Sequence, residues 1–228
     1  MSTIADNIAL VVSRIRAAEQ AARRPEHSVQ LLAVSKTKPA QALREAYAAG
    51  LRDFGENYLQ EALGKQAELT DLSLIWHFIG PIQSNKTRAI AEHFAWVHSV
   101  DRLKIAQRLS EQRPSGLPPL NICIQVNVSG EASKSGCTPA DLPALAHAID
   151  ALPRLKLRGL MAIPEPTEDR AAQDAAFAAV QRLQASLDLP LDTLSMGMSH
   201  DLESAIAQGA TWVRIGTALF GARDYGGH

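Results

Sequence analysis

The chain is poor in cysteine, nearly neutral, and without a long hydrophobic run. Its 228 residues include 2 cysteines, too few for a disulfide framework or a four-cysteine metal site. The 23 basic and 24 acidic residues nearly cancel, so no overall field favours nucleic acid or an anionic membrane as a partner. No stretch approaches the length of a membrane span. These absences leave small molecules as the expected ligands, and they predict no metal site.

The beginning of the sequence lacks the features of a secretory signal. Residues 1–10 contain Asp6 and show no basic segment followed by an apolar run. Cys123 lies in an apolar run and Cys137 in a polar stretch, a pair that fits a reducing compartment. We therefore expect a cytoplasmic protein, and we expect a monomer because no long exposed apolar seam is evident.

Composition and length predict one folded domain. Hydrophobic residues make up 46% of the chain and charged residues 21%, which is ordinary globular usage rather than that of a disordered segment. A length of 228 residues fits one large domain or two small ones. The sequence shows no repeat, low-complexity tract or linker, so we expect a single domain over residues 1–228.

Hydrophobic periodicity predicts an initial helix followed by alternating strands and helices. Apolar residues recur at helical spacing from Ile4 to Arg24. Eight short aliphatic runs follow, separated by stretches of helical composition, and Asp101, Thr138 and Thr167 stand where helix N-caps are expected. The runs predicted as strands are Leu31–Ser35, Arg52–Gly55, Leu74–Ile79, Ala95–Ser99, Asn121–Val128, Lys156–Ala162, Thr193–Met196 and Thr211–Ile215.

This alternation predicts an α/β fold, a single (β/α)8 TIM-type barrel with an extra N-terminal helix. Alternating strands and helices form a parallel sheet covered by helices, and eight strands can close into a barrel. The alternative is an open doubly wound sheet. It is disfavoured because residues 35–39, directly after the first strand, read Ser-Lys-Thr-Lys-Pro instead of a glycine-rich phosphate loop.

In such a barrel, the residues that follow each strand form the functional site, and Lys36 follows the first. Partial desolvation at the mouth and the nearby charge of Lys38 favour a neutral amine, the form that condenses with an aldehyde to an imine. A solvated loop lysine is the alternative.

The residues after the seventh and eighth strands predict an anion site. Barrels often bind phosphate there, and Ser199 and Thr217 supply hydroxyl and amide donors while Gly216 lets an anion approach the backbone. As alternatives, Ser199 caps a helix that begins near Asp201, and Gly216 forms a turn.

Arg214 lies within an otherwise apolar strand, where a charge needs a partner or an opening. An arginine facing the ring nitrogen recurs in sites that bind pyridoxal phosphate. A structural ion pair with a carboxylate of the barrel is the alternative.

Six ordered motifs carry a resemblance that runs nearly from end to end. The chain resembles the pyridoxal phosphate homeostasis proteins, whose barrel is related to the N-terminal domain of alanine racemase. The motifs are Ala33-Val34-Ser35-Lys36-Thr37-Lys38, Phe54-Gly55-Glu56-Asn57-Tyr58, Trp76-His77-Phe78-Ile79-Gly80 leading to Gln83-Ser84-Asn85-Lys86, Ser133-Lys134-Ser135-Gly136, Ser195-Met196-Gly197-Met198-Ser199 with Asp201, and Arg214-Ile215-Gly216-Thr217.

The resemblance implies a site for pyridoxal 5′-phosphate. It implies that Lys36 carries the cofactor as a Schiff base, that Asn57 lines the ring pocket and that Arg214 faces the ring nitrogen. Ser199, Gly216 and Thr217 would hold the phosphate. His77 and Lys134 belong to the shared motifs without an assigned role; a hydrogen-bonded core histidine and a loop cation are the alternatives for them.

We expect a non-catalytic carrier rather than an enzyme. Racemisation needs two opposed acid–base groups, and Lys36 supplies one. Alanine racemase takes the second, a tyrosine, from an additional β domain that this chain lacks, and the resemblance gives Tyr58 no such role. A cation at Arg214 also disfavours protonation of the ring nitrogen. The expected function is homeostasis of intracellular vitamin B6 and thereby of amino-acid balance, with cofactor-dependent apoenzymes as candidate recipients. The alternative is a minimal racemase or another enzyme that uses the same cofactor.

Overall fold

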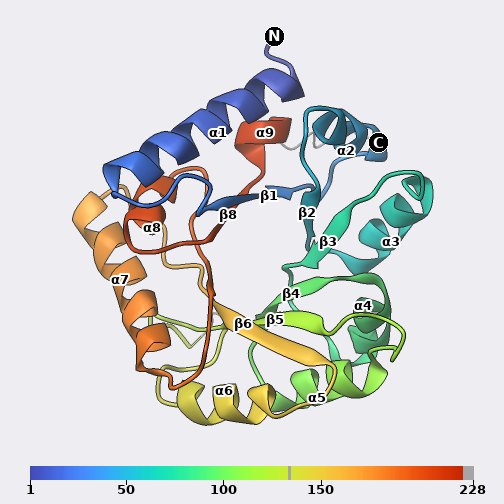
Figure 1. Cartoon of the computed structure of the whole chain (residues 1–228), viewed down its shortest axis with the longest axis vertical. Coiled ribbons are helices and arrows are strands. Elements are labelled where there is room, and N and C mark those ends of the chain that lie inside the picture. Colours follow the sequence, from blue (N-terminus) through green and yellow to red (C-terminus); the bar gives the residue numbers. More distant parts are fainter. Residues whose placement is uncertain (133–134, 223–228) are drawn as a thin grey trace.

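Eight parallel strands close into a barrel that is surrounded by helices (Figure 1). The computed structural model describes residues 1–132 and 135–222. Each strand pairs with the next along the chain, and β8 returns to pair with β1, which confirms the predicted (β/α)8 barrel. The strands are β1 (Gln30–Val34), β2 (Asp53–Glu56), β3 (Ile75–Phe78), β4 (Trp96–Val100), β5 (Leu120–Gln125), β6 (Leu155–Met161), β7 (Thr193–Ser195) and β8 (Trp212–Ile215).

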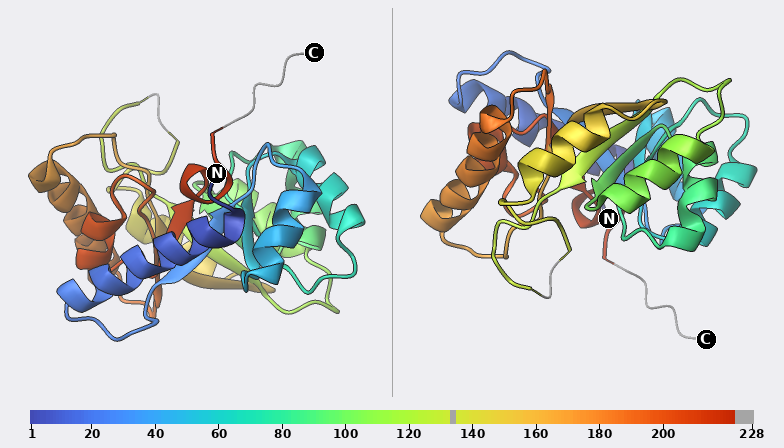
Figure 2. Two further views of the ribbon diagram at one scale, coloured as in Figure 1. Left: turned by 90° about the horizontal axis from the view of Figure 1, so that it is seen from above. Right: turned by 90° about the horizontal axis from the view of Figure 1, so that it is seen from below.

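The helices form an outer ring, which Figure 2 shows from two further sides. The extra N-terminal helix packs outside the ring against the two final helices, and it begins at a capping box between Thr3 and Asp6. The helices are α1 (Ile4–Ala21), α2 (Ala40–Ala48), α3 (Leu59–Glu68), α4 (Thr87–His93) after a 3₁₀ turn η1 (Ser84–Lys86), α5 (Leu103–Gln112), α6 (Leu142–Asp150), α7 (Arg170–Ser186), α8 (Leu202–Ala207) and α9 (Thr217–Phe220).

The three expected helix caps are wrong in detail. Asp101 does not cap α5, because its carboxylate accepts a hydrogen bond from the Gly136 amide at 3.2 Å. Thr138 precedes a turn, and α6 begins later than expected. Thr167 accepts a hydrogen bond from the Asp169 amide, and it is Asp169 that caps α7. Thr138 and Thr167 accept from backbone amides in the loop before their helix, whereas Asp101 accepts from an amide 35 residues further along the chain.

Two apolar cores position the site. The larger one lies between the strands and the helices, and a smaller one fills the interior of the barrel with Leu32, Ile79, Trp96, Cys123, Met161 and Trp212. Side chains therefore close the barrel as a packed core rather than a pore. The buried polar residues include His77, His98, Ser195 and Arg214, each at 5% exposure or less.

A membrane-spanning helix is not found in residues 1–132 or 135–222, because none of their helices combines the required length with the required apolarity.

Candidate functional site

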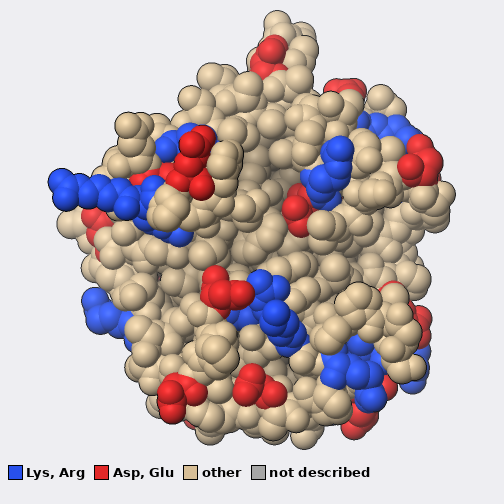
Figure 3. Space-filling view, in the orientation of Figure 1, with Lys and Arg blue, Asp and Glu red and all other residues tan. Residues whose placement is uncertain are grey.

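A cavity of about 330 Å³ opens where the strands end, and such a volume is typical of small-molecule sites, about 300–1,000 Å³. Figure 3 shows a hollow at the centre of one face, with acidic and basic side chains scattered around it rather than gathered in one patch. The structure brings all six residues of the predicted site to the wall of this cavity: Lys36, Asn57, Ser199, Arg214, Gly216 and Thr217.

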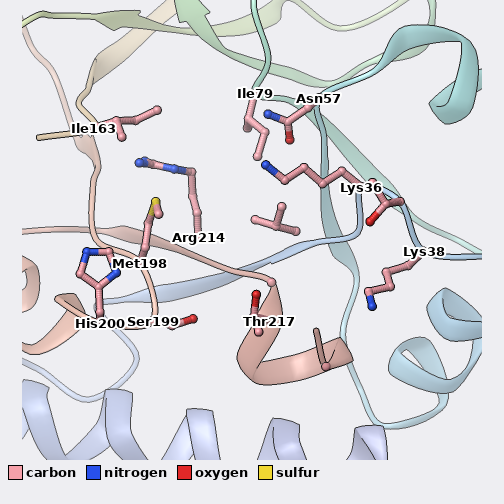
Figure 4. A pocket seen from close by; sticks show the side chains of 14 residues that line it. Lys36, Lys38, Asn57, Ile79, Ile163, Met198, Ser199, His200, Arg214 and Thr217 are labelled. Atoms are coloured by element: carbon pink, nitrogen blue, oxygen red, sulfur yellow. The ribbon is translucent and has the colours of Figure 1, made fainter. Parts of the chain in front are cut away.

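Lys36 stands on a tight turn that follows β1. The Lys38 amide donates to the Ser35 carbonyl at 3.1 Å, and Thr37 adopts a left-handed conformation with φ of 66°. The side chain of Lys36 extends into the cavity toward Asn57 (Figure 4). Lys38 points away from the Lys36 amine, and its Nζ donates to the Ala222 carbonyl at 2.8 Å. The geometry thus presents Lys36, rather than Lys38, to a ligand.

An ionic cluster of Glu56, Glu61 and Lys65 packs against this turn and holds it in place. Lys65 on α3 donates to the Ser35 carbonyl at 2.6 Å and to Glu56 Oε1 at 2.7 Å, and it also contacts Glu61. Glu61 accepts from the Thr37 amide at 2.5 Å. Burial raises the pKa of Glu56, while Lys65 and the Ser35 hydroxyl oppose that rise. Charged hydrogen bonds therefore tie the turn to β2 and α3.

We expect Glu56→Gln to change stability in a pH-dependent way. Because the pKa of Glu56 is raised in the fold, the wild type loses stability as the pH rises through that pKa. Glutamine does not ionise, so the variant should gain stability relative to the wild type as the pH rises above about 4, the ordinary carboxyl pKa, until Glu56 is ionised in the folded wild type as well. Urea unfolding at each pH measures the difference, and the exposed Glu45→Gln on α2 is the control. A difference that stays constant or falls would mean that the cluster keeps Glu56 ionised throughout.

Asn57 follows β2 and presents an unsatisfied oxygen. Its Oδ1 is buried and has no hydrogen-bond partner among the residues that the structure describes. Gly80 packs directly on the backbone of Asn57, since a Cβ at position 80 would lie 2.3 Å from the Asn57 carbonyl oxygen. Any larger residue would displace Asn57. A buried polar atom without a partner fits a place where a bound ligand supplies the missing hydrogen bond.

The loops after β7 and β8 offer donors on the other side of the cavity. Gly197 turns the chain with φ of 100°, and a Cβ there would lie 2.6 Å from the Cβ of Ala205. This turn brings Ser199 to the cavity wall, which Gly216 and Thr217 also line, and Figure 4 shows the Ser199 side chain pointing toward Thr217. Within the described parts of the chain, the hydroxyls of Ser199 and Thr217 donate to no other protein group, so both are available to an anion.

The alternative role of Ser199 as a helix cap is wrong. Helix α8 begins at Leu202 with Asp201 as the N-cap residue, and Asp201 Oδ1 accepts from the Met198 amide at 2.7 Å. The carbonyl of Ser199 accepts from Arg14 on α1 at 2.9 Å, which anchors the loop. The hydroxyl of Ser199 is left to the cavity.

Arg214 is held by neutral groups. Its Nη1 donates to Ser195 Oγ at 2.8 Å and its Nη2 to the Ala162 carbonyl at 3.0 Å. No carboxylate among residues 1–132 and 135–222 forms an ion pair with it, so the structure does not show the alternative of a structural salt bridge. Burial lowers the pKa of Arg214 to about 10, which still leaves a cation at neutral pH. The guanidinium therefore has N–H donors in excess of its two protein acceptors.

The cavity also has apolar walls that the sequence analysis did not single out. Val34, Ile79, Ile163 and Met198 line it, together with His200. Ile79 and Ile163 follow β3 and β6, so the rule that functional residues follow strands would have identified them. By contrast, His77 lies fully buried in the barrel interior and is hydrogen-bonded there. This confirms the alternative of a hydrogen-bonded core histidine. Lys134 lies outside the described residues.

The sequence and the fold of the chain are similar to those of known proteins. Residues 7–224 match the family described as "Alanine racemase, N-terminal domain". The "Pyridoxal phosphate homeostasis protein" of Pseudomonas aeruginosa is 79% identical over 226 residues, which cover 99% of this chain and 98% of that protein. The structure of PipY from Synechococcus elongatus with pyridoxal phosphate bound is 46% identical, with a TM-score of 0.80, over 91% of this chain and all of that one.

A more distant structure supports the fold alone. Alanine racemase from Corynebacterium glutamicum is 19% identical and superposes with a TM-score of 0.69. The match covers 99% of this chain but 62% of the racemase. The barrel is thus the part that the two proteins have in common.

Proposed function

The chain belongs to the family of pyridoxal phosphate homeostasis proteins, and we propose that it binds and releases pyridoxal 5′-phosphate, with Lys36 as the residue that carries it. The observation that supports this assignment best is the convergence of three kinds of donor on one cavity. An amine, a guanidinium and two hydroxyls face it from Lys36, Arg214, Ser199 and Thr217. The bound cofactor supplies an aldehyde that forms a Schiff base with a lysine.

The residues present fit each part of this ligand. The Lys36 amine is placed to bind the aldehyde, and the hydroxyls of Ser199 and Thr217 to bind the phosphate beside Gly216. The remaining donors of Arg214 suit an unprotonated ring nitrogen, which accepts a hydrogen bond. The unsatisfied Oδ1 of Asn57 suits a polar substituent of the ring. No residue in this set requires a metal ion.

We propose that the protein is a carrier and regulator of the cofactor rather than a racemase. A cation at Arg214 disfavours protonation of the ring nitrogen, which weakens the ring as an acceptor of electrons. Tyr58 is 51% exposed and is not part of the described cavity wall. The alternative, a minimal racemase, would need an acid–base group across the cavity from Lys36, and His200 is the cavity residue with suitable chemistry.

Amino-acid turnover should therefore be absent or marginal. The test follows exchange of the α-hydrogen for deuterium and the appearance of the D-isomer when the loaded protein is incubated with L-alanine. His200→Gln and Lys36→Ala serve as comparison variants. Sustained exchange by the wild type that either substitution abolishes would establish the enzyme and contradict the carrier.

The remaining assignments complete the proposal. Residues 1–228 would act as one cofactor-binding domain, a monomer in the cytoplasm, with apoenzymes that use the cofactor as recipients. Both cysteines are buried thiols, and burial raises the pKa of Cys123 to about 12 and that of Cys137 to about 11. Neither is a reactive thiolate at neutral pH, which is compatible with a reducing compartment.

A further inference from the structure

A continuous chain of hydrogen bonds crosses the barrel interior beneath the cavity. It begins at Arg214, whose Nη1 lies 2.8 Å from Ser195 Oγ, and Ser195 Oγ lies 2.8 Å from His98 Nδ1. His98 Nε2 lies 2.9 Å from His77 Nδ1, and His77 Nε2 lies 2.8 Å from Asp53 Oδ1. We call Ser195, His98, His77 and Asp53 the interior chain. Its members come from four different strands: β7, β4, β3 and β2.

With both imidazoles neutral, Arg214 and Asp53 fix the position of every hydrogen in the interior chain. Arginine can only donate and an ionised aspartate can only accept. When His77 donates from Nε2 to Asp53 and both rings are neutral, Ser195 must accept from Arg214 and donate to Nδ1 of His98. That leaves the hydrogen of His98 on Nε2, where it points to Nδ1 of His77, and the hydrogen of His77 on Nε2, where it points to Asp53. Both imidazoles are neutral in this arrangement.

The surroundings agree with neutral imidazoles. Burial lowers the pKa of His77, although Asp53 opposes the effect, and burial lowers the pKa of His98 well below its ordinary value. The charge of Arg214 acts on His98 in the same direction. Each ring is thus kept as both a donor and an acceptor.

The interior chain joins the two faces of the barrel. Arg214 lines the cavity at the C-terminal ends of the strands. Asp53 begins β2, and its side chain is 23% exposed, so it lies at the opposite face. Asn57, at the cavity end of β2, follows Asp53 by four residues. At 3.3 Å per residue, about 13 Å of strand separates the two. The cation of Arg214 therefore lies at the cavity, and the carboxylate of Asp53 lies at the solvent-exposed end.

Two indole rings hold the middle of the chain. His77 stacks on Trp96 with ring centroids 5.4 Å apart and an angle of 12°, and it meets Trp212 edge-on at 4.9 Å. Trp96 and Trp212 also contact each other. The aromatic rings fix the orientation of His77 and exclude water from its hydrogen bonds.

A wholly apolar interior would be the simpler way to fill a barrel, since buried polar groups are tolerated only when all their hydrogen bonds are made. The interior chain makes them all, and it ends on a residue of the cavity wall. Resting on the proposed function, we propose that the interior chain positions Arg214 toward the ring nitrogen of the cofactor, with Asp53 as its remote counter-charge. Its members are positioning residues, because none of them lines the cavity.

The inference predicts that substitutions at the two ends of the interior chain are coupled. Ser195→Ala removes one of the two protein acceptors of Arg214, and Asp53→Asn removes the charge but keeps the shape. Each should weaken binding of pyridoxal phosphate by about two- to tenfold, the range for one hydrogen bond, and shift the absorption maximum of the bound cofactor. The double variant should be no worse than Ser195→Ala alone, since the link is already broken. The titration is read from that absorbance at fixed pH.

Asp71→Asn is the matched control. Asp71 is 58% exposed and pairs with Arg44 at the surface, so it should leave affinity and spectrum unchanged. Effects of Asp53→Asn and Ser195→Ala that simply add would show that Asp53 acts outside the chain and would overturn the inference. An Asp53→Asn variant with the affinity and absorption maximum of the wild type would also overturn the inference.

Imidazole ¹⁵N NMR of the cofactor-free protein tests the hydrogen order directly. In the wild type, His77 and His98 should both be neutral with the hydrogen on Nε2. In Asp53→Asn the carboxamide can donate as well as accept, so the Nδ1–H form of His77 should appear. A charged His77 or a wild-type hydrogen on Nδ1 would overturn the inference whatever the cofactor does. If this pattern holds but the cofactor does not bind, the proposed function fails and the hydrogen order stands.

Discussion

Lys36→Ala should abolish the absorbance band of the imine and leave the barrel folded. The lysine stands on a turn at the cavity mouth and is only partly buried, so its loss should not disturb either core. Without its amine the aldehyde has no partner in the cavity, because the nearby Lys38 already donates to the Ala222 carbonyl and points away. Borohydride reduction followed by peptide mapping should find the cofactor on Lys36 in the wild type and nowhere in the variant.

Lys38→Ala is the matched control for this prediction. It removes a lysine two positions away on the same turn, and it should keep both the band and the reduced adduct. Circular dichroism checks that both variants retain the barrel. Reduction that fixes the cofactor to Lys38 or Lys134 in the wild type would show that the assignment to Lys36 is wrong.

The fold was predictable because each strand is a short apolar run bounded by polar turns. All eight predicted strands are present, but the fifth was predicted too long. The Val126 amide still donates to the Met161 carbonyl of β6 at 3.0 Å, but Val126 also bridges to Cys137 and the Asn127 amide donates to the Cys137 carbonyl, so regular pairing ends after Gln125. A run of apolar residues cannot show where pairing stops, because that depends on a distant partner.

The residues around the cavity were predictable for a topological reason. Parallel strands bring their C-terminal ends to one face, so Lys36 and Arg214 line the same cavity although 178 positions separate them in the sequence. The interior chain could not be predicted in this way. His98 and Ser195 are 97 residues apart, and their contact depends on the register and tilt of strands around the closed barrel. The sequence could place His77 only as a core histidine with an unknown partner.

Pyridoxal should bind far more weakly than pyridoxal 5′-phosphate if the loops after β7 and β8 hold the phosphate. The phosphate carries a charge of about −1.5 to −2 at neutral pH, and hydrogen bonds to charged groups contribute about 1.5–3 kcal/mol each. Loss of two such bonds, from Ser199 and Thr217, would cost about 3–6 kcal/mol if they added, or more than about a hundredfold in affinity. The imine on Lys36 forms with either ligand, so it cannot compensate for the difference.

Two substitutions at Ser199 should separate charge from hydrogen bonding. Ser199→Ala removes one hydroxyl and leaves Gly216 and the Thr217 hydroxyl in place, so binding should weaken moderately. Ser199→Asp sets a carboxylate against the phosphate, so it should be much more harmful for pyridoxal phosphate. For pyridoxal, which has no phosphate, the two variants should differ little. Each protein is titrated with both ligands at fixed pH. Equal affinity of the wild type for the two ligands, or no loss in Ser199→Asp, would place the phosphate elsewhere, because an anion in contact with Ser199 must respond to a negative charge at that position.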